Sequence, residues 1–141
     1  MGKKKVTQPA GESASKGSAA ASKKIKKILH GKVYINASYN NTIVSVTDEK
    51  GNIIAWATAG SLGFSGPKKA TPFAASKIMA VITEKLHAAG ATDLDIIVKG
   101  VGSGRDSSVR SLINQGFNIN SIKDVTPVPH NGPRPKKLRR V

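Results

Sequence analysis

The charged residues divide this chain of 141 residues into three parts, and only the middle part has the composition of a folded domain. Residues 1–32 carry a net charge of +8 and residues 127–141 carry +5, whereas residues 33–126 carry only +2. The first segment has no apolar periodicity, and four prolines keep the last one out of a sheet interior. We therefore predict a disordered basic arm over residues 1–30, one globular domain over residues 31–126 and an extended basic arm over residues 127–141.

The first half of the predicted domain has the period-two pattern of antiparallel strands. The alternation predicts a half-buried strand whose inward side chains are Val33, Ile35, Ala37 and Tyr39. Asn40-Asn41 suits a two-residue hairpin turn, because asparagine tolerates positive φ. Two more strands, over residues 42–48 and 53–59, would complete a meander.

The second half predicts alternating helices and strands. A helix of about five turns should run from the N-cap Thr71, with Pro72 in its first position, to the C-terminal Gly90. Its inward stripe is Ala74, Ile78, Val81, Ile82 and Leu86. Residues 94–99 are apolar enough for a buried strand, placed parallel to an earlier one by a crossover through the helix.

A second helix and a last strand complete the predicted domain. The helix should end at Gly116, with the inward residues Val109, Leu112 and Ile113, and the strand should cover about residues 119–126. The order βββαβαβ predicts an α/β fold with a mixed five-stranded sheet, two packed helices and basic flexible termini, a layout like that of ribonuclease H.

The turn between that strand and that helix, GVGSGR over residues 100–105, has the composition of an anion site. Glycines without Cβ atoms let backbone amides approach one point, and Arg105 adds a charged fork of donors near a helix N-terminus. A dinucleotide fingerprint needs glycine where Arg105 stands, and a P-loop needs a Gly-Lys pair followed by Ser or Thr, which the chain lacks. A soluble nucleotide is therefore disfavoured, and the alternative that the glycines only close a tight turn stays open.

The polar residues of the sequence do not predict an enzyme. There is no cysteine, and the first predicted strand carries no carboxylate, although a nuclease of ribonuclease-H type needs carboxylates gathered there to hold two cations. His30, His87 and His130 have no ligand partners nearby in sequence, so we predict surface or contact roles for them. No catalysis, no metal and no cofactor are expected.

The net charge of +15 points to a polyanionic partner. No apolar stretch is long enough to span a membrane, the N-terminus lacks the apolar segment of a signal peptide, and the lack of cysteine fits a reducing cytosol. Nucleic acid is therefore the expected partner, with a cytoplasmic location. An alternative is a chaperone of nucleic acid, or a binder of anionic membranes, that acts through its arms alone.

Four segments resemble, in order and spacing, the bacterial form of the eleventh protein family of the small ribosomal subunit. They are NNTIVSVTD, WATAGSLGFSGPKKATPFAA, VKGVGSGRDSSVRSL and GFNINSIKDVTPVPHNGPRPKKLRRV, and the resemblance runs from about residue 31 to residue 141. Two departures lie in the GVGSGR turn, where Val101 and Ser103 stand at positions that are usually proline in this family.

The resemblance implies a structural component of the subunit platform that binds small-subunit ribosomal RNA near the exit path of messenger RNA. It also implies contacts with neighbouring platform proteins, and no homo-oligomer is expected. The residues that it places against RNA are Asn41, Lys68, Lys69, Gly100, Gly102, Ser103, Gly104, Arg105, His130, Asn131, Arg134, Lys136, Lys137, Arg139 and Arg140.

Overall fold

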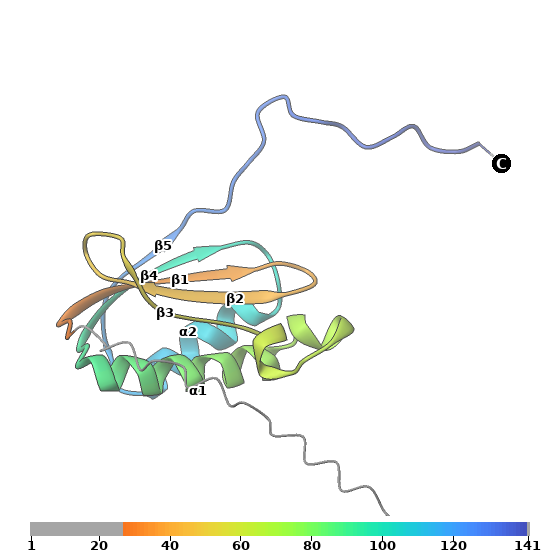
Figure 1. Cartoon of the computed structure of the whole chain (residues 1–141). Helices are drawn as coiled ribbons and strands as arrows, with labels where there is room; N and C mark the ends of the chain where they lie inside the picture. The colour runs from red at the N-terminus through yellow and green to blue at the C-terminus, as the bar shows by residue number, and fades with distance from the viewer. Residues whose placement is uncertain (1–26, 141) are drawn as a thin grey trace, which may run out of the picture.

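A computed structural model describes residues 27–140 and contains one sheet with helices packed against it (Figure 1). The strands are β1 (His30–Ala37), β2 (Thr42–Thr47), β3 (Ile53–Thr58), β4 (Asp93–Lys99) and β5 (Asn118–Asp124). The helices are α1 (Pro72–Ala89) and α2 (Gly104–Asn114), preceded by the short 3₁₀ turns η1 (Gly60–Leu62) and η2 (Gly66–Ala70). The predicted order βββαβαβ and the α/β class are confirmed.

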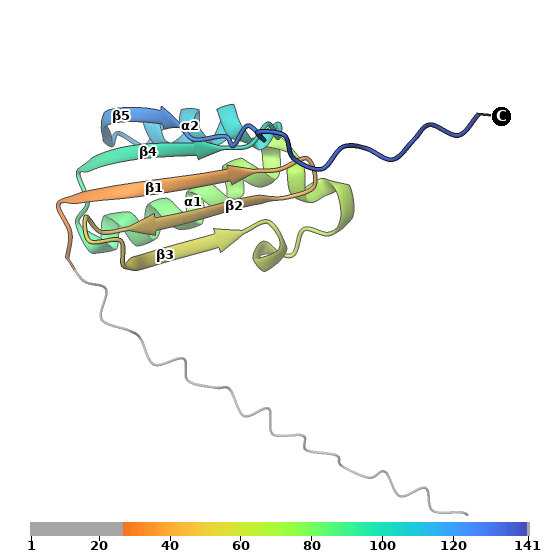
Figure 2. The ribbon, with the colours of Figure 1, turned by 90° about the horizontal axis from the view of Figure 1, so that it is seen from above.

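The five strands form a single mixed sheet in the order β3-β2-β1-β4-β5 (Figure 2). The pairs β1–β2 and β2–β3 are antiparallel, and the pairs β1–β4 and β4–β5 are parallel. The crossover through α1 puts β4 parallel to an earlier strand, as predicted, and the structure shows that this strand is β1. Because β1 and β4 are parallel, their C-terminal ends lie at the same end of the sheet.

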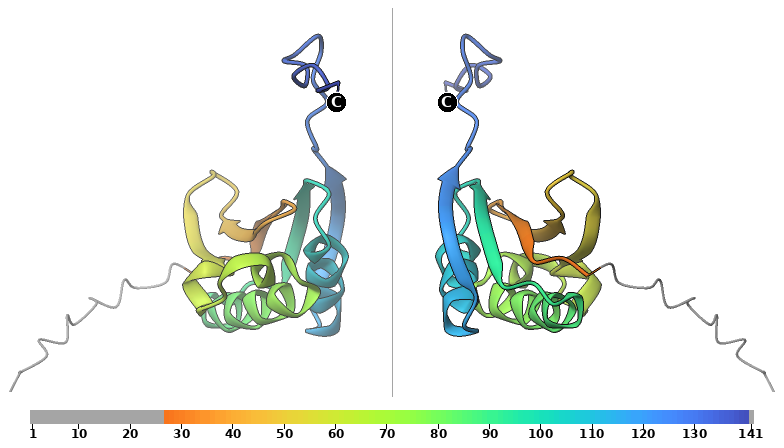
Figure 3. Two further views of the ribbon diagram at one scale, coloured as in Figure 1. Left: turned by 90° about the vertical axis from the view of Figure 1, so that its right-hand side faces the viewer. Right: turned by 90° about the vertical axis from the view of Figure 1, so that its left-hand side faces the viewer.

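Both helices cover the same face of the sheet, and the core lies between them and the strands (Figures 1 and 3). The largest fully buried side chains include Ile35, Ile78, Ile82, Leu94, Ile96 and Leu112. The opposite face of the sheet has no helix over it within residues 27–140. A sheet residue on that face is exposed to solvent unless a partner covers it.

The ends of α1 lie where the capping residues predict them, whereas the buried faces of both helices differ in part from the predicted faces. Thr71 Oγ1 accepts a hydrogen bond from the Ala74 N–H, and Gly90 ends the helix with φ 75°. Met79 is fully buried, although the predicted stripe omits it, because α1 packs against α2 as well as the sheet. Ile113 was predicted to point inward and is 53% exposed, while the small Ser108 is buried.

The first hairpin corrects another prediction. The strand β1 ends at Ala37, and the Ser38 N–H donates to the Asn41 carbonyl oxygen, so Tyr39 and Asn40 form the tip instead of Asn40 and Asn41. No residue of this turn has positive φ. Tyr39 is consequently 79% exposed and not on the inward face. The alternation of apolar residues continues to Tyr39, one step beyond the end of the strand. The geometry of the turn, and not the sequence pattern, therefore decides where the strand ends.

The chain on either side of the predicted domain is only partly described. The Ile28 N–H donates to the Ala89 carbonyl oxygen and β1 begins at His30, so the fold starts slightly before residue 31. Most of the predicted N-terminal arm, residues 1–26, lies outside the described residues, and its disorder stays a prediction. Residues 127–140 carry no helix or strand and rise from the side of the sheet opposite the helices (Figure 1).

Candidate nucleic-acid interface

One end of the sheet gathers most of the predicted site residues that lie in the domain. The C-terminal ends of β1 and β4, the hairpin 38–41, the turn η2 and the N-termini of both helices all meet there (Figure 2). Each helix N-terminus contributes a partial positive charge. We call this region the loop end of the sheet.

The glycines of the GVGSGR turn let it pack directly on the first hairpin. A Cβ atom on Gly100 would collide with the Ala37 carbonyl oxygen, and one on Gly102 would collide with the Ser38 carbonyl oxygen. A Cβ atom on Gly104 would lie 2.6 Å from Thr42 Oγ1. Close approach of two backbones is thus a sufficient reason for glycine at positions 100 and 102, and close approach of the Thr42 side chain is one at position 104. This packing matches the alternative that the glycines only close a tight turn.

Several amides of this turn have partners within the protein. The Gly100 N–H donates to Thr126 Oγ1 at 3.1 Å, and the Gly102 N–H donates to the Ala37 carbonyl oxygen at 2.9 Å. The Arg105 N–H donates to the Gly102 carbonyl oxygen at 3.2 Å. The expected cradle of amides around one anion would therefore have to form without these three donors.

The Arg105 side chain also has partners inside the fold. Its Nη1 donates to the Gly100 carbonyl oxygen at 3.0 Å, and its Nη2 lies 2.6 Å from Asp124 Oδ2 in an ion pair. Hydrogen bonds from Thr126, and then the one from Arg105, lower the pKa of Asp124 from 3.8 to about 2. The carboxylate is thus held ionised opposite the guanidinium.

These contacts fix the base of the C-terminal arm. Asp124 Oδ1 accepts hydrogen bonds from both the backbone N–H and the hydroxyl of Thr126, and the Val125 N–H donates to the Val98 carbonyl oxygen. The sequence alone predicts no role for Asp124 or Thr126. An acidic residue just before a basic arm was the available signal, but only the fold brings it to Arg105, nineteen positions earlier.

The lysines of the glycine-rich loop are joined to the same region. Lys68 and Lys69 lie in the last turn of η2, where Lys68 is exposed and Lys69 is half-buried. The Ser103 hydroxyl donates a short hydrogen bond to the Ala70 carbonyl oxygen, which connects the GVGSGR turn to this loop. A proline at this position would have no hydroxyl to make this bond.

Asn41 completes the loop end from the hairpin. Its side-chain Oδ1 accepts a hydrogen bond from the Thr42 N–H at 2.9 Å, and its carbonyl oxygen accepts one from Ser38. The side chain is therefore oriented by the hairpin itself, and the Asn41 residue is half-buried.

The remaining predicted residues lie on the arm, away from the loop end. They are all exposed and comprise His130, Asn131, Arg134, Lys136, Lys137, Arg139 and Arg140. Within residues 27–140 no salt bridge involves this arm. The structure therefore separates a set of internally bonded polar groups in the turn from a set of solvated cations on the arm.

Comparison with known proteins identifies the family of this chain. The family described as ribosomal protein S11 matches residues 31–140. This chain belongs to the ribosomal protein S11 family. It is 48% identical over 137 residues to the small ribosomal subunit protein uS11 of Saccharophagus degradans, an alignment that covers 96% of this chain and all of the relative.

Two further S11 relatives have the same name and similar coverage. The uS11 of Treponema pallidum (strain Nichols) is 47% identical over 119 residues, covering 84% of this chain and 94% of the relative. The uS11 of Buchnera aphidicola subsp. Cinara cedri is 46% identical over 142 residues and covers both chains completely. The resemblance seen in the sequence is thus confirmed at the level of the family.

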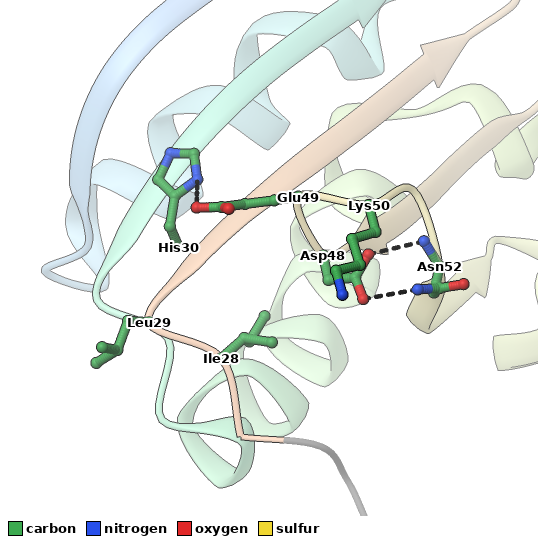
Figure 4. Close-up of a pocket in the computed structure, with 7 residues that line it drawn as sticks. All are labelled: Ile28, Leu29, His30, Asp48, Glu49, Lys50 and Asn52. Atoms are coloured by element: carbon green, nitrogen blue, oxygen red, sulfur yellow. Dashed lines mark hydrogen bonds and ion pairs between the residues drawn. The ribbon is translucent and has the colours of Figure 1, made fainter.

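At the opposite end of the sheet, this S11-family chain carries a hollow lined by Ile28, Leu29 and five polar residues (Figure 4). His30 bridges two carboxylates, with its Nε2 3.1 Å from Asp95 Oδ2 and its Nδ1 3.5 Å from Glu49 Oε1. Asp48 accepts hydrogen bonds from the backbone and side chain of Asn52, which closes the β2–β3 turn. The sequence alone does not predict the histidine pairs, since Asp95 comes from β4 and Glu49 from the turn between β2 and β3.

Two features are absent from residues 27–140. No group of three His, Asp or Glu residues that could hold a metal ion occurs in this part of the chain. None of its helices is long and apolar enough to cross a membrane.

Proposed function

We propose that this chain is a structural constituent of the small ribosomal subunit that binds ribosomal RNA through the loop end and the C-terminal arm. The observation that carries the proposal is the arm: five cations, exposed along a segment without helix or strand, leave the domain from a base held by Arg105 and Asp124. Membership of the S11 family and the names of the relatives support the subunit. The family resemblance supports a place on the platform, near the messenger RNA exit.

The arm would act by electrostatics. The prolines bias it towards an extended conformation, so each of its five cations can reach a separate phosphate. If all five do, the slope of log affinity against log salt concentration would include about −3.5 to −4.5 from the arm, at about 0.7 to 0.9 per contact. Lys68, Lys69, Asn41 and the GVGSGR turn would add contacts where the domain meets the RNA.

The proposed role needs no chemistry at the protein. The domain would hold RNA and neighbouring ribosomal proteins in a fixed arrangement in the cytoplasm, as a monomer within the particle and without a catalytic step. An alternative in which the arms alone bind any polyanion would leave the domain without a partner.

Sedimentation of the tagged chain from a cell lysate tests the proposal. We expect co-migration with small subunits, and a chain found only in the free pool would overturn the assignment. Two matched deletions, of residues 1–24 and of residues 127–141, then separate domain from arms. We expect the chain without residues 127–141 to lose most of the salt dependence of its RNA affinity. Its domain should still prefer small-subunit ribosomal RNA to an unrelated RNA of equal length. Equal affinity for both RNAs would favour the arms-only alternative.

A further inference from the structure

The face of the sheet opposite the helices carries two exposed aromatic side chains. Tyr34 of β1 is 38% exposed and Trp56 of β3 is 56% exposed. Their neighbours along each strand, such as Ile35 and Ala57, are buried on the helix side, so the alternation of strand residues puts Tyr34 and Trp56 on the other face. We call this surface the open face.

The strand register places the two aromatic residues in one row across the sheet. The residues that pair across the sheet in one row are Trp56, Ser45, Tyr34, Ile97 and Lys123. Tyr34 and Trp56 are two strands apart, a distance of about 10 Å at the spacing of neighbouring strands. The open face therefore carries two exposed aromatic side chains in one row, with Ser45 between them.

A groove of about 240 Å³ runs beside Tyr34 at the arm side of this face. Apolar and polar groups share its lining, which comprises Tyr34, Ile35, Asn36, Ile43, Ser45, Ile97, Lys99 and Val125. An amide, a hydroxyl and an ammonium group thus surround an aromatic ring. A nucleobase, with an apolar face and a polar edge, has matching chemistry.

Charge around the groove favours a polyanion. Lys99 lines it, and Lys123 lies in the same row as Tyr34, while no carboxylate lines the groove. The acids of this face, Asp93 and Asp95, lie at the other end of β4 and are bonded to Asn118 and His30. The cationic arm starts just beyond Val125, which lines the groove, and rises on this side of the sheet (Figures 1 and 3).

We propose that the open face binds an unpaired stretch of the RNA, with one base stacked on Tyr34 in the groove and another on Trp56. The proposal rests on the function proposed above, since the arm and Lys99 would hold the phosphates of the same strand. Stacking on aromatic side chains tolerates any base, so the face would select unpaired RNA rather than a sequence. Paired RNA has no free base face to offer and would be held by the arm and the loop end alone.

The single tryptophan of the chain allows a direct test. The full chain is titrated with an unpaired RNA of about ten nucleotides, followed by the fluorescence of Trp56. The matched ligand is the same strand with abasic sites in place of its bases, which keeps every phosphate. We expect quenching by the first strand and little quenching by the second. Equal quenching by both strands would overturn the proposal.

Variants at Tyr34 give the second readout. Tyr34→Leu keeps an apolar side chain but removes the ring, so the affinity for the unpaired strand should fall about 5- to 150-fold. Tyr34→Phe keeps the ring and should bind as the original chain does. Ile113→Ala, on the exposed side of α2, is the control for loss of apolar surface elsewhere. Affinity for a fully paired, blunt-ended RNA duplex should stay the same in all three variants.

The outcomes separate this inference from the proposed function. If the chain binds paired and unpaired RNA but Tyr34→Leu has no effect, the open face does not stack bases and the proposed function stands. If the chain binds neither RNA, the proposed function itself fails. In assembled subunits, a photoreactive residue in place of Tyr34 should cross-link to RNA. Cross-linking to a protein instead would show that a protein partner covers this face and would overturn the proposal.

Discussion

The GVGSGR turn and the C-terminal arm are both basic and were both predicted to contact RNA, yet their polar groups are used differently. In the turn, Arg105 is bonded to Gly100 and Asp124, and the amides of Gly100 and Gly102 are bonded to other segments. On the arm, the cations are exposed and form no salt bridge within residues 27–140. The difference shows that the residues of a basic, glycine-rich turn can be used for contacts within the fold, whereas the charges of an exposed arm stay available for a ligand.

The turn should be the most sensitive part of the fold to substitution. Gly100→Ala would add a Cβ atom against the Ala37 carbonyl oxygen at a residue with φ 95°, so we expect a loss of about 3 kcal/mol in the free energy of unfolding. Gly116→Ala is the matched control, because Gly116 has φ 83° but no atom within 4 Å of the added Cβ, and should lose about 1 kcal/mol. Urea denaturation of both variants measures the two values, and similar losses would show that the close approach costs little.

Single charge removals should distinguish the turn from the arm in RNA binding. Lys137→Ala should lower the magnitude of the slope of log affinity against log salt concentration by about 0.7 to 0.9. The reason is that each phosphate neutralised by an exposed cation releases counterions from the RNA, and this variant loses one such contact. Arg105→Ala should weaken binding with a smaller change of slope, since its guanidinium is already paired with Asp124. Affinities measured over a salt series provide the slopes. An equal fall in slope for both would mean that Arg105 exchanges Asp124 for a phosphate.

The link between the turn and the lysine loop should have a moderate effect. Ser103→Ala removes the hydrogen bond to the Ala70 carbonyl oxygen and should cost about 1 kcal/mol of stability. Hydrogen exchange of the segment from Gly66 to Ala70 would show whether the loop loosens. Ser107→Ala, which removes a hydroxyl bonded within α2, controls for the loss of a serine, and equal exchange in both variants would argue against a specific link.

The smallest effect is expected in acid. The pKa of Asp124 is lowered to about 2 in the fold, so its carboxylate stabilises the fold above a pH of about 4, and this contribution is lost as the pH falls through about 2. Asp124→Asn should therefore lower the urea midpoint near neutral pH and reduce its fall between those pH values. A midpoint that depends on pH identically in both chains would show that the carboxylate contributes nothing measurable.

Local signals predicted the elements well, and the exceptions share one cause. Thr71, Pro72 and Gly90 mark the ends of α1 because capping depends on a few adjacent residues. Tyr39 and Ile113 continue an apolar period but are exposed. Tyr39 lies in the hairpin turn itself, and α2 packs mainly against α1 with residues other than Ile113. Periodicity records which side chains could be buried, whereas burial itself depends on what packs opposite them.

The sequence by itself determined the α/β class, the element order, the family and the division into a near-neutral domain and cationic arms. The class and the element order follow from the period and spacing of the residues, and the division follows from the distribution of charge, which are local properties of the chain. The family follows from the resemblance of four segments to known proteins. Only the tertiary structure decided that Arg105 is paired with Asp124, that Ser103 is bonded to Ala70, and that Tyr34 and Trp56 share an open face. Such contacts join residues far apart in the chain, and their partners are chosen by strand order and register, which no single segment encodes.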